Sequence, residues 1–362
     1  MNDGHLNRYC ISKFLVVLFV SSIVVAMASG SCAPVSIVRE AKSYNSWPMI
    51  QAVGDRLCCA YSRGSAHTIN EGKRGVWAKV SADGGKTWSE EAPVANDPRW
   101  GEVTIGKGAD ATGAMLLWVR CWGEGAHHDL YRSADGIRFE KIATPALDPL
   151  PMQITDIIRV PDVGLMCLWF SAAYRDGQDK AWGTLVSPDE GRTWTQRTIE
   201  SGLEREDWPT EPSGVWLGDG RILVVARSEG TTKHQFQLVS SDSGKSWRKS
   251  RTNITDVQES TPSLVYDDKT GTVYNYYYQR GARQLKRRRT KADFIFGHPM
   301  GWPEPEILFE GQEQRAYDAG NVNVTVLNGR HYAATYTGST TDTAVLVVPA
   351  SPETSEGQAR KQ

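Results

Sequence analysis

Four arginines stand at matching places in the chain, and their type and spacing suggest chemistry. They are Arg63, Arg120, Arg227 and Arg280. Arg63 follows Pro48 by 15 positions and Arg227 follows Pro212 by 15, while the other two end comparable apolar segments. A guanidinium stays charged and grips a carboxylate through two parallel hydrogen bonds. If these segments converge, the arginines form a cationic site for a carboxylate or for several hydroxyls; four solvated loop residues are the alternative.

A repeated turn motif indicates how the chain positions them. Four segments share a pattern of Ser, Asp, Gly and an aromatic residue: Ser81–Trp88, Ser133–Phe139, Ser187–Trp194 and Ser241–Trp247. Their aspartates, at positions 83, 135, 189 and 242, are separated by steps of 52, 54 and 53 residues. Asp and Ser side chains bond nearby backbone N–H groups, Gly accepts positive φ, and Trp fills space between strands. We therefore expect these aspartates to build turns rather than to catalyse.

A second repeat predicts the fold. Six short segments open units of about 50 to 60 residues, near positions 47–50, 102–105, 154–157, 211–214, 261–264 and 321–324. Apolar return strands follow at 57–61, 115–119, 164–170, 222–226, 273–278 and 331–336. This pattern predicts an all-β protein, a six-bladed β-propeller of four-stranded antiparallel blades over residues 33–350. A polar tail is expected at 351–362.

The Ser-x-Asp-x-Gly-x-x-Trp pattern resembles the Asp box, or BNR repeat, of the sialidase (neuraminidase) superfamily. The segment from Glu211 to Arg227 is similar to the sialidase segment in which a glutamate opens one strand and an arginine ends the next. The resemblance implies that Glu211 is the base for a tyrosine nucleophile and that Arg227 binds the substrate carboxylate. A surface Glu–Arg pair is the alternative.

The same resemblance places the nucleophile in the last blade, before the Asn-Gly turn at 328–329. Tyr317 is the candidate there. A tyrosine is a poor nucleophile near its ordinary pKa, so it needs a carboxylate that takes its proton. Asp318 is a rival, because a carboxylate can itself act in glycoside cleavage.

The first blade departs from the sialidase pattern in two ways. The loop 62–74 contains no Asp where sialidases carry their acid/base, which leaves Glu71 or His67 as proton donors. Ser46-Trp47-Pro48 stands where sialidases have Arg-Ile-Pro, so Ser46 takes the place of the first arginine of their carboxylate-binding triad. The ring of Trp47 beside it offers a surface for a sugar. Arg63 or Arg280 are candidates to supply the missing charge. The missing arginine and aspartate favour a related sugar as an alternative to sialic acid.

The first 28 residues have the pattern of a secretory signal peptide. Arg8 and Lys13 precede an apolar run of about 15 residues, shorter than the roughly 20 of a membrane span. Ala26-Met27-Ala28 offers a cleavage site. We expect a secreted or periplasmic protein without a membrane span. Lipid attachment at Cys32, giving an outer-membrane lipoprotein, is the alternative.

Composition and charge exclude several classes of function. The formal net charge is −1, so the protein has no overall positive potential that would attract nucleic acid. The basic run 286–289 is expected to be a solvated strand face or loop. Five cysteines remain beyond residue 28, and no pair has the spacing of zinc ligands, so they are expected to be buried apolar residues. Neither a cofactor nor a metal is expected, and the protein is expected to be a monomer.

Together these features predict a secreted retaining exo-glycosidase that acts on sialic acid or a related terminal sugar, with a glycan as partner. Two alternatives stay open. One is a propeller that binds carbohydrate without cleaving it, and the other is a structural or protein-binding propeller with a degenerate site.

Overall fold

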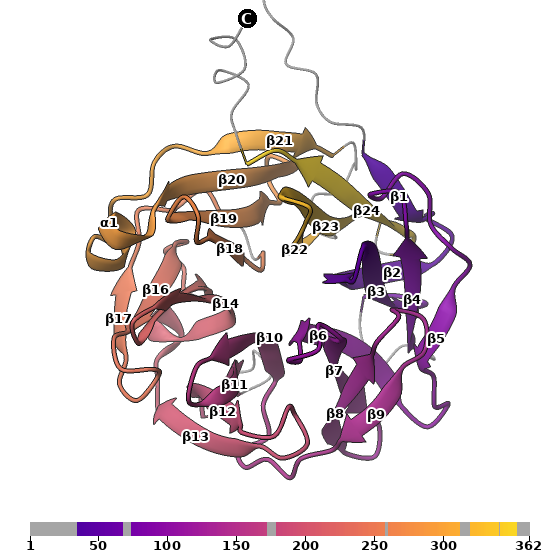
Figure 1. Ribbon diagram of the computed structural model, residues 1–362, viewed down its shortest axis with the longest axis horizontal. Helices are drawn as coiled ribbons and strands as arrows, with labels where there is room; N and C mark the ends of the chain where they lie inside the picture. Colours follow the sequence, from indigo (N-terminus) through magenta and orange to yellow (C-terminus); the bar gives the residue numbers. More distant parts are fainter. Residues whose placement is uncertain are drawn as a thin grey trace, which may run out of the picture. The chain divides into compact units, whose positions relative to one another are not determined.

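Six four-stranded antiparallel sheets form a ring around one axis in the compact unit Cys32–Gln362 (Figure 1). The computed structural model describes residues 35–67, 74–171, 179–257, 260–311, 319–339 and 341–352. Within these ranges the only helices are α1 (Ala292–Gly297) and a short 3₁₀ turn (Arg205–Asp207). The predicted all-β, six-bladed propeller is therefore confirmed.

Five blades are each formed by one continuous stretch of the chain, and in each blade the first strand is nearest the axis and the fourth is outermost. Blade 1 contains β2 (Tyr44–Val53), β3 (Arg56–Gly64), β4 (Gly75–Ser81) and β5 (Ala92–Ala95). Blade 2 contains β6 (Gly101–Ala109), β7 (Met115–Trp122), β8 (Ala126–Ser133) and β9 (Glu140–Ala143). Blade 3 contains β10 (Gln153–Val160), β11 (Gly164–Phe170), β12 (Trp182–Ser187) and β13 (Thr195–Glu200). Blade 4 contains β14 (Pro209–Gly218), β15 (Arg221–Ser228), β16 (Gln235–Ser240) and β17 (Arg248–Arg251). Blade 5 contains β18 (Ser263–Asp267), β19 (Thr272–Gln279), β20 (Gln284–Lys291) and β21 (Glu306–Glu310).

Blade 6 combines both ends of the described chain. Its inner strands are β22 (Gly320–Leu327), β23 (Arg330–Gly338) and β24 (Thr343–Ala350), and its outermost strand is β1 (Ser36–Arg39). Ser36 pairs with Val347 in this antiparallel contact. The pairing covers the exposed edge of β24 and closes the ring. Sequence periodicity did not predict it, because β1 precedes the first repeat.

The Asp boxes join the third and fourth strands of blades 1 to 4. In the first, the Ser81 hydroxyl donates to Asp83 Oδ1 at 2.8 Å, and the Gly85 and Thr87 amides donate to the Ser and Asp side chains. These hydrogen bonds, led by that from the Thr87 hydroxyl, lower the pKa of Asp83. The predicted structural role of the four aspartates is confirmed. In the fourth box the serine that bonds Asp242 is Ser240, one position earlier than expected.

The core lies between adjacent blades, in clusters built from the facing sides of neighbouring sheets. Large aromatic side chains such as Trp118 and Trp169 are completely buried there. The four described cysteines are free and buried, as predicted: they are Cys58, Cys59, Cys121 and Cys167. The described part of the fold is therefore stabilised by packing between blades, without disulfides.

The prediction that the basic run 286–289 is a solvated strand face or loop is wrong. Instead of facing solvent, Lys286, Arg287 and Arg288 are buried in β20. Lys286 and Arg288 share the carboxylate of Asp256, at 2.8 and 2.7 Å, and Arg287 pairs with Glu306 at 2.6 Å. Third strands in a propeller are covered on both faces by neighbouring blades, so even a polar segment is buried there and needs partners.

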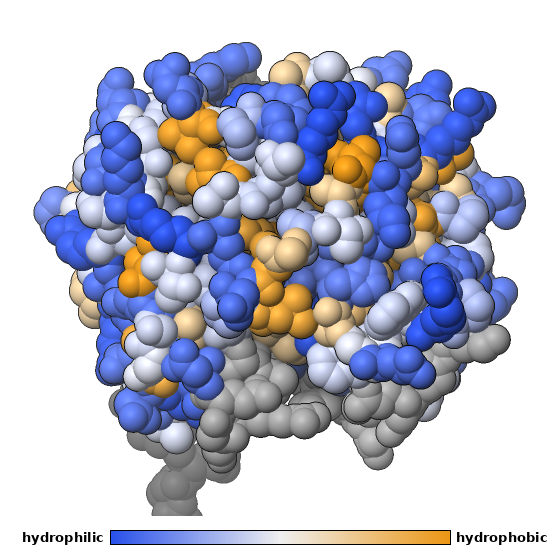
Figure 2. Space-filling view, turned by 90° about the horizontal axis from the view of Figure 1, so that it is seen from below, coloured by the Kyte–Doolittle hydropathy of each residue, from blue (hydrophilic) through white to orange (hydrophobic). Residues whose placement is uncertain are grey.

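The outer surface is mixed in character. On the side shown in Figure 2, apolar side chains lie in small groups among polar ones. In the part of the chain that the structure describes, no helix has the length and apolar character needed to cross a bilayer.

Candidate functional site

The inner strands of all six blades surround a narrow axial depression. Its lining is Trp47, Pro48, Met49, Thr104, Ile105, Gln153, Thr155, Asp156, Pro212, Thr261, Pro262, Asn321, Val322 and Asn323. Its volume of about 20 Å³ is enough for about one water molecule. A sugar ring would therefore lie over this depression, against the side chains at its rim, rather than inside it.

A repeated backbone irregularity forms this rim. The inner strands β2, β6, β10, β14 and β22 each contain a register shift of one extra residue near their first residues, as in a β-bulge. At the bulge the backbone of Trp47, Glu211 and Asn321 is left-handed, with φ of 50°, 48° and 48°. Such a backbone costs roughly 1–3 kcal/mol for a non-glycine residue and is concentrated at functional sites. Three equivalent strained positions around one axis mark this rim as the candidate site.

Glu211 and Arg227 lie together on β14 and β15. Arg227 Nη1 is 3.0 Å from Glu211 Oε2, and Glu211 is only 4% exposed. The bulge at Glu211 also removes the need for a ladder hydrogen bond at the next residue, which suits Pro212. The sequence prediction that this carboxylate and this guanidinium are neighbours agrees with the structure.

A second buried carboxylate shares the same guanidinium. Glu229 Oε1 lies 2.8 Å from Arg227 Nε, and Thr210 donates to Glu229 at 2.9 Å. Arg227 is thus held between Glu211 and Glu229, and its guanidinium already contacts two carboxylates.

On blade 1 an aromatic and basic cluster stands at the rim. The rings of Trp47 and His67 are 5.6 Å apart, and the Tyr44 hydroxyl is 2.6 Å from His67 Nδ1. The guanidinium of Arg74, which is 3% exposed, lies 4.9 Å from the Trp47 ring centre. The structure therefore brings two predicted residues, Trp47 and His67, together with a cation that the sequence did not single out. Its position over the Trp47 ring brings positive charge to the blade that lacks the expected arginine.

The other three arginines lie near the ends of β3, β7 and β19, and their side chains contact different partners. Arg63 lies 4.2 Å over the Trp77 ring and 2.7 Å from Glu91, toward the outer strands of blade 1. Arg120 lies over the Trp122 ring at 4.8 Å and is 5% exposed. None of the four arginines lines the described depression.

Arg280 lies next to the start of the inner strand β22, close to the rim of the axial depression. Its Nε donates to the carbonyl oxygen of Ala319 at 2.7 Å, directly before β22. Ala319 follows Asp318 and Tyr317 in sequence, and these two residues, like Glu71 and Cys32, lie outside the described residues. Their predicted roles therefore stay predictions.

Sequence reasoning missed Arg74, Glu229 and Asp156. Asp156 is the one ionisable side chain that lines the described depression, where it accepts hydrogen bonds from Ser213 at 2.7 Å and Asn323 at 3.4 Å. Glu229 follows Arg227 by two positions, so alternation along the strand could have placed it beside that arginine. Nothing in the local sequence indicates that Arg74 reaches Trp47.

Comparison with known proteins gives a family and a fold. The BNR repeat-like domain family matches residues 55–317. A protein of unknown function from Dyadobacter fermentans is 16% identical, with a TM-score of 0.69 over 86% of this chain and 97% of that one. The NanB sialidase of Streptococcus pneumoniae (K499G mutant) is 12% identical, with a TM-score of 0.68 over 88% of this chain and 70% of that one.

A sialidase from Trypanosoma rangeli, solved as a covalent intermediate with 2,3-difluorosialic acid, is 14% identical with a TM-score of 0.64. The match covers 88% of this chain and 60% of that one. At these identities the likeness shows a shared fold. No curated protein sequence matches the chain.

Proposed function

Because this chain belongs to the BNR repeat-like domain family, we propose that it is a retaining exo-glycosidase acting on terminal sugars of glycans. The observation that carries the proposal is the buried Glu211 carboxylate, held at 3.0 Å by Arg227 on a strained bulge at the rim of the propeller axis. A rigid, buried carboxylate at the mouth of a depression is suited to take a proton from a neighbouring nucleophile.

The proposed mechanism divides the work among three parts of the rim. Glu211 accepts the proton of the Tyr317 phenol, whose oxygen bonds to the anomeric carbon as the glycosidic bond breaks. Water then displaces the Tyr317 oxygen, which takes back its proton, and the free sugar leaves. Asp318 is the alternative nucleophile. His67, or Glu71 in the same loop, gives a proton to the leaving oxygen. Trp47 offers an aromatic face to the sugar ring. Arg227 and Arg280 contact the polar groups of the substrate. Arg63 and Arg120 have the least support for direct contact with the substrate.

The sugar is proposed to be sialic acid or a related terminal sugar. Sialidases of known structure share the fold, which supports the first choice. Arg227 already pairs with Glu211 and Glu229, and Ser46 stands in place of the expected arginine, so a sugar other than sialic acid is the alternative.

A panel of chromogenic α-sialosides, uronides and neutral glycosides tests the activity. We expect release of the chromophore from at least one member of the panel, with release from sialosides identifying a sialidase. Release is measured by absorbance, and binding of each glycan by calorimetry. Binding of a glycan without release from any member would contradict the proposal and favour the second candidate, a carbohydrate-binding propeller. That candidate is supported by the first-blade loop 62–74, which has no Asp where sialidases carry their acid/base.

We also propose that the protein is exported and monomeric. The charged, apolar and small-residue segments within residues 1–28 support export. Among the described residues few large apolar side chains are exposed, which supports a monomer. Expression of the full chain in a bacterial host is expected to give a mature N-terminus at Ser29, read by mass spectrometry. Lipid on a mature N-terminal Cys32 would instead show an anchored protein, and retention of Met1 would contradict export.

A further inference from the structure

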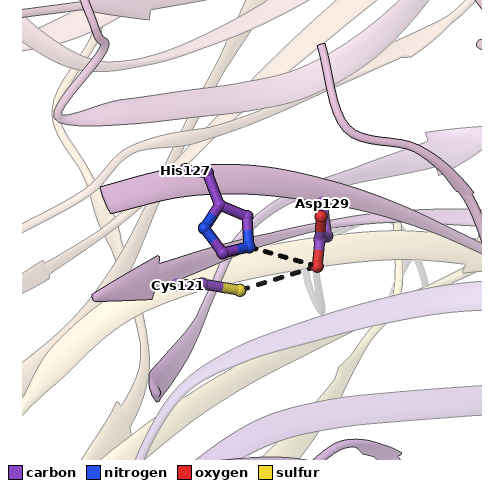
Figure 3. Close-up of side chains that lie close together, drawn as sticks. All are labelled: Cys121, His127 and Asp129. Carbon is purple, nitrogen blue, oxygen red and sulfur yellow. Dashed lines mark hydrogen bonds and ion pairs between the residues drawn. The ribbon is translucent and has the colours of Figure 1, made fainter. Parts of the chain in front are cut away.

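A second group of side chains with metal-ligating atoms lies on the face of blade 2 that packs toward blade 1. It consists of Cys121 on β7 and of His127 and Asp129 on β8, which point toward one another (Figure 3). Cys121 and His127 are directly paired across the two strands, and His127 and Asp129 are two positions apart, so all three point to one face. The strand register, rather than any spacing in the sequence, brings them together.

The donor atoms have nearly the separation that a bound metal ion requires. His127 Nε2 is 3.6 Å from Asp129 Oδ2, Cys121 Sγ is 3.7 Å from the same oxygen, and all three atoms lie within 4.8 Å of one another. Donors at ~2.0–2.3 Å from a tetrahedral Zn²⁺ are about 3.5 Å apart. Small side-chain adjustments therefore suffice for all three to reach one ion.

An open cavity gives access to the cluster. A space of about 360 Å³ between blades 1 and 2 is lined by His127 and Asp129 together with Glu102, Trp100 and Lys141. The His127 side chain is 28% exposed, while Asp129 is 4% exposed. An ion can enter from this cavity and meet a buried carboxylate, which holds a cation more strongly than an exposed one.

The existing partners of Asp129 leave room for an ion. The Thr144 hydroxyl donates to Asp129 Oδ1 at 2.5 Å, which leaves the other oxygen to His127, Cys121 and Lys141. The Lys141 ammonium is 3.3 Å from Oδ2, but its side chain is 52% exposed and can turn into solvent. A divalent ion bound to Asp129 Oδ2 would replace the single positive charge of Lys141 by two positive charges.

We propose that Cys121, His127 and Asp129 bind a thiophilic divalent transition-metal ion, for which Zn²⁺ is the reference. A thiolate, an imidazole and a carboxylate form a mixed donor set that suits Zn²⁺ and disfavours Ca²⁺ or Mg²⁺. On binding, the Cys121 thiol loses its proton to solvent. Because His127 and Asp129 line the cavity, a water molecule from it would be available as a fourth ligand.

Titration of the purified, tag-free full chain with CoCl₂ and ZnCl₂ tests the site. We expect about one ion per chain, with a thiolate-to-cobalt charge-transfer band that Zn²⁺ abolishes. Cys121→Ala is expected to lose the band, and His127→Ala and Asp129→Asn to weaken binding at least about tenfold. The matched controls Cys59→Ala, another buried thiol, and His298→Ala, an exposed imidazole, are expected to bind as the parent does.

Three results would overturn the proposal: no cobalt binding by the parent protein, a band that persists in Cys121→Ala, or binding that weakens equally in the controls. Circular dichroism checks that each variant is folded. If Cys121→Ala does not fold, His127→Ala decides, because its partly exposed side chain can be removed with little effect on packing.

Discussion

Replacing Glu211 by Gln is expected to lower kcat by about 10²–10⁴-fold on whichever glycoside the protein cleaves, with glycan affinity changed by less than about tenfold. The amide has nearly the same shape as the carboxylate but cannot accept a proton. Arg227 keeps its 2.8 Å contact with Glu229 in this variant, so the guanidinium and the strained bulge stay in place. Initial rates give kcat, and calorimetry with a non-cleaved analogue gives the affinity.

Two further variants interpret the result. Glu204→Gln changes an exposed carboxylate just before the 3₁₀ turn that leads into β14, and it is expected to leave kcat unchanged. Glu229→Gln changes the other carboxylate on Arg227 and is expected to reduce kcat less than Glu211→Gln. Full turnover in Glu211→Gln would exclude Glu211 as the base, and an equal loss in both buried variants would assign Glu211 a positioning role through Arg227.

The largest effect on stability is expected from Asp256→Asn, a loss of about 3–5 kcal/mol in the free energy of unfolding. The Asp256 carboxylate contacts two buried cations, Lys286 at 2.8 Å and Arg288 at 2.7 Å, and accepts a hydrogen bond from Tyr277 at 3.0 Å. An amide removes the negative charge but leaves both cations in a poorly hydrated place, where each is costly. Urea denaturation monitored by tryptophan fluorescence measures the change.

The matched control is Asp293→Asn, which breaks an ion pair with Arg221 of similar length, 2.6 Å, whose carboxylate is 85% exposed. Its expected cost is at most about 1 kcal/mol. Adding Lys286→Met to Asp256→Asn is expected to recover part of the loss, because one of the two uncompensated cations is removed. Equal losses at positions 256 and 293 would show that burial of the basic run contributes little.

Local chemistry determined the most secure predictions. The Asp boxes were predictable because Ser81 and Asp83 hydrogen-bond to amides at most four residues away, so the turn forms from its own side chains. The boxes occur only in blades 1 to 4. In blade 5 the third and fourth strands are joined by a segment that includes α1, and in blade 6 the fourth strand is β1, from the other end of the described chain.

The site was predictable only where a motif stays within one hairpin. Glu211 and Arg227 are on paired strands of blade 4, so their 3.0 Å contact follows from hairpin geometry. Arg74 reaches Trp47 from the start of the third strand, and the arginines at the ends of β3 and β7 turn to partners on their own outer strands or to a neighbouring aromatic ring. Arginines at equivalent positions of different blades need not point the same way. Each guanidinium turns toward whichever carboxylate or aromatic ring lies nearest to it.

By itself, the amino-acid sequence determined the six repeated units, their turns and the Glu211–Arg227 pair, because each depends on hydrogen bonds or strand pairing between segments close together along the chain. Only the tertiary structure decided the closure of the ring by β1, the burial of Lys286 to Arg288 against Asp256, and the meeting of Cys121, His127 and Asp129 beside an inter-blade cavity. These features depend on which face of a strand a neighbouring blade covers, and that is set by packing of whole sheets around the axis.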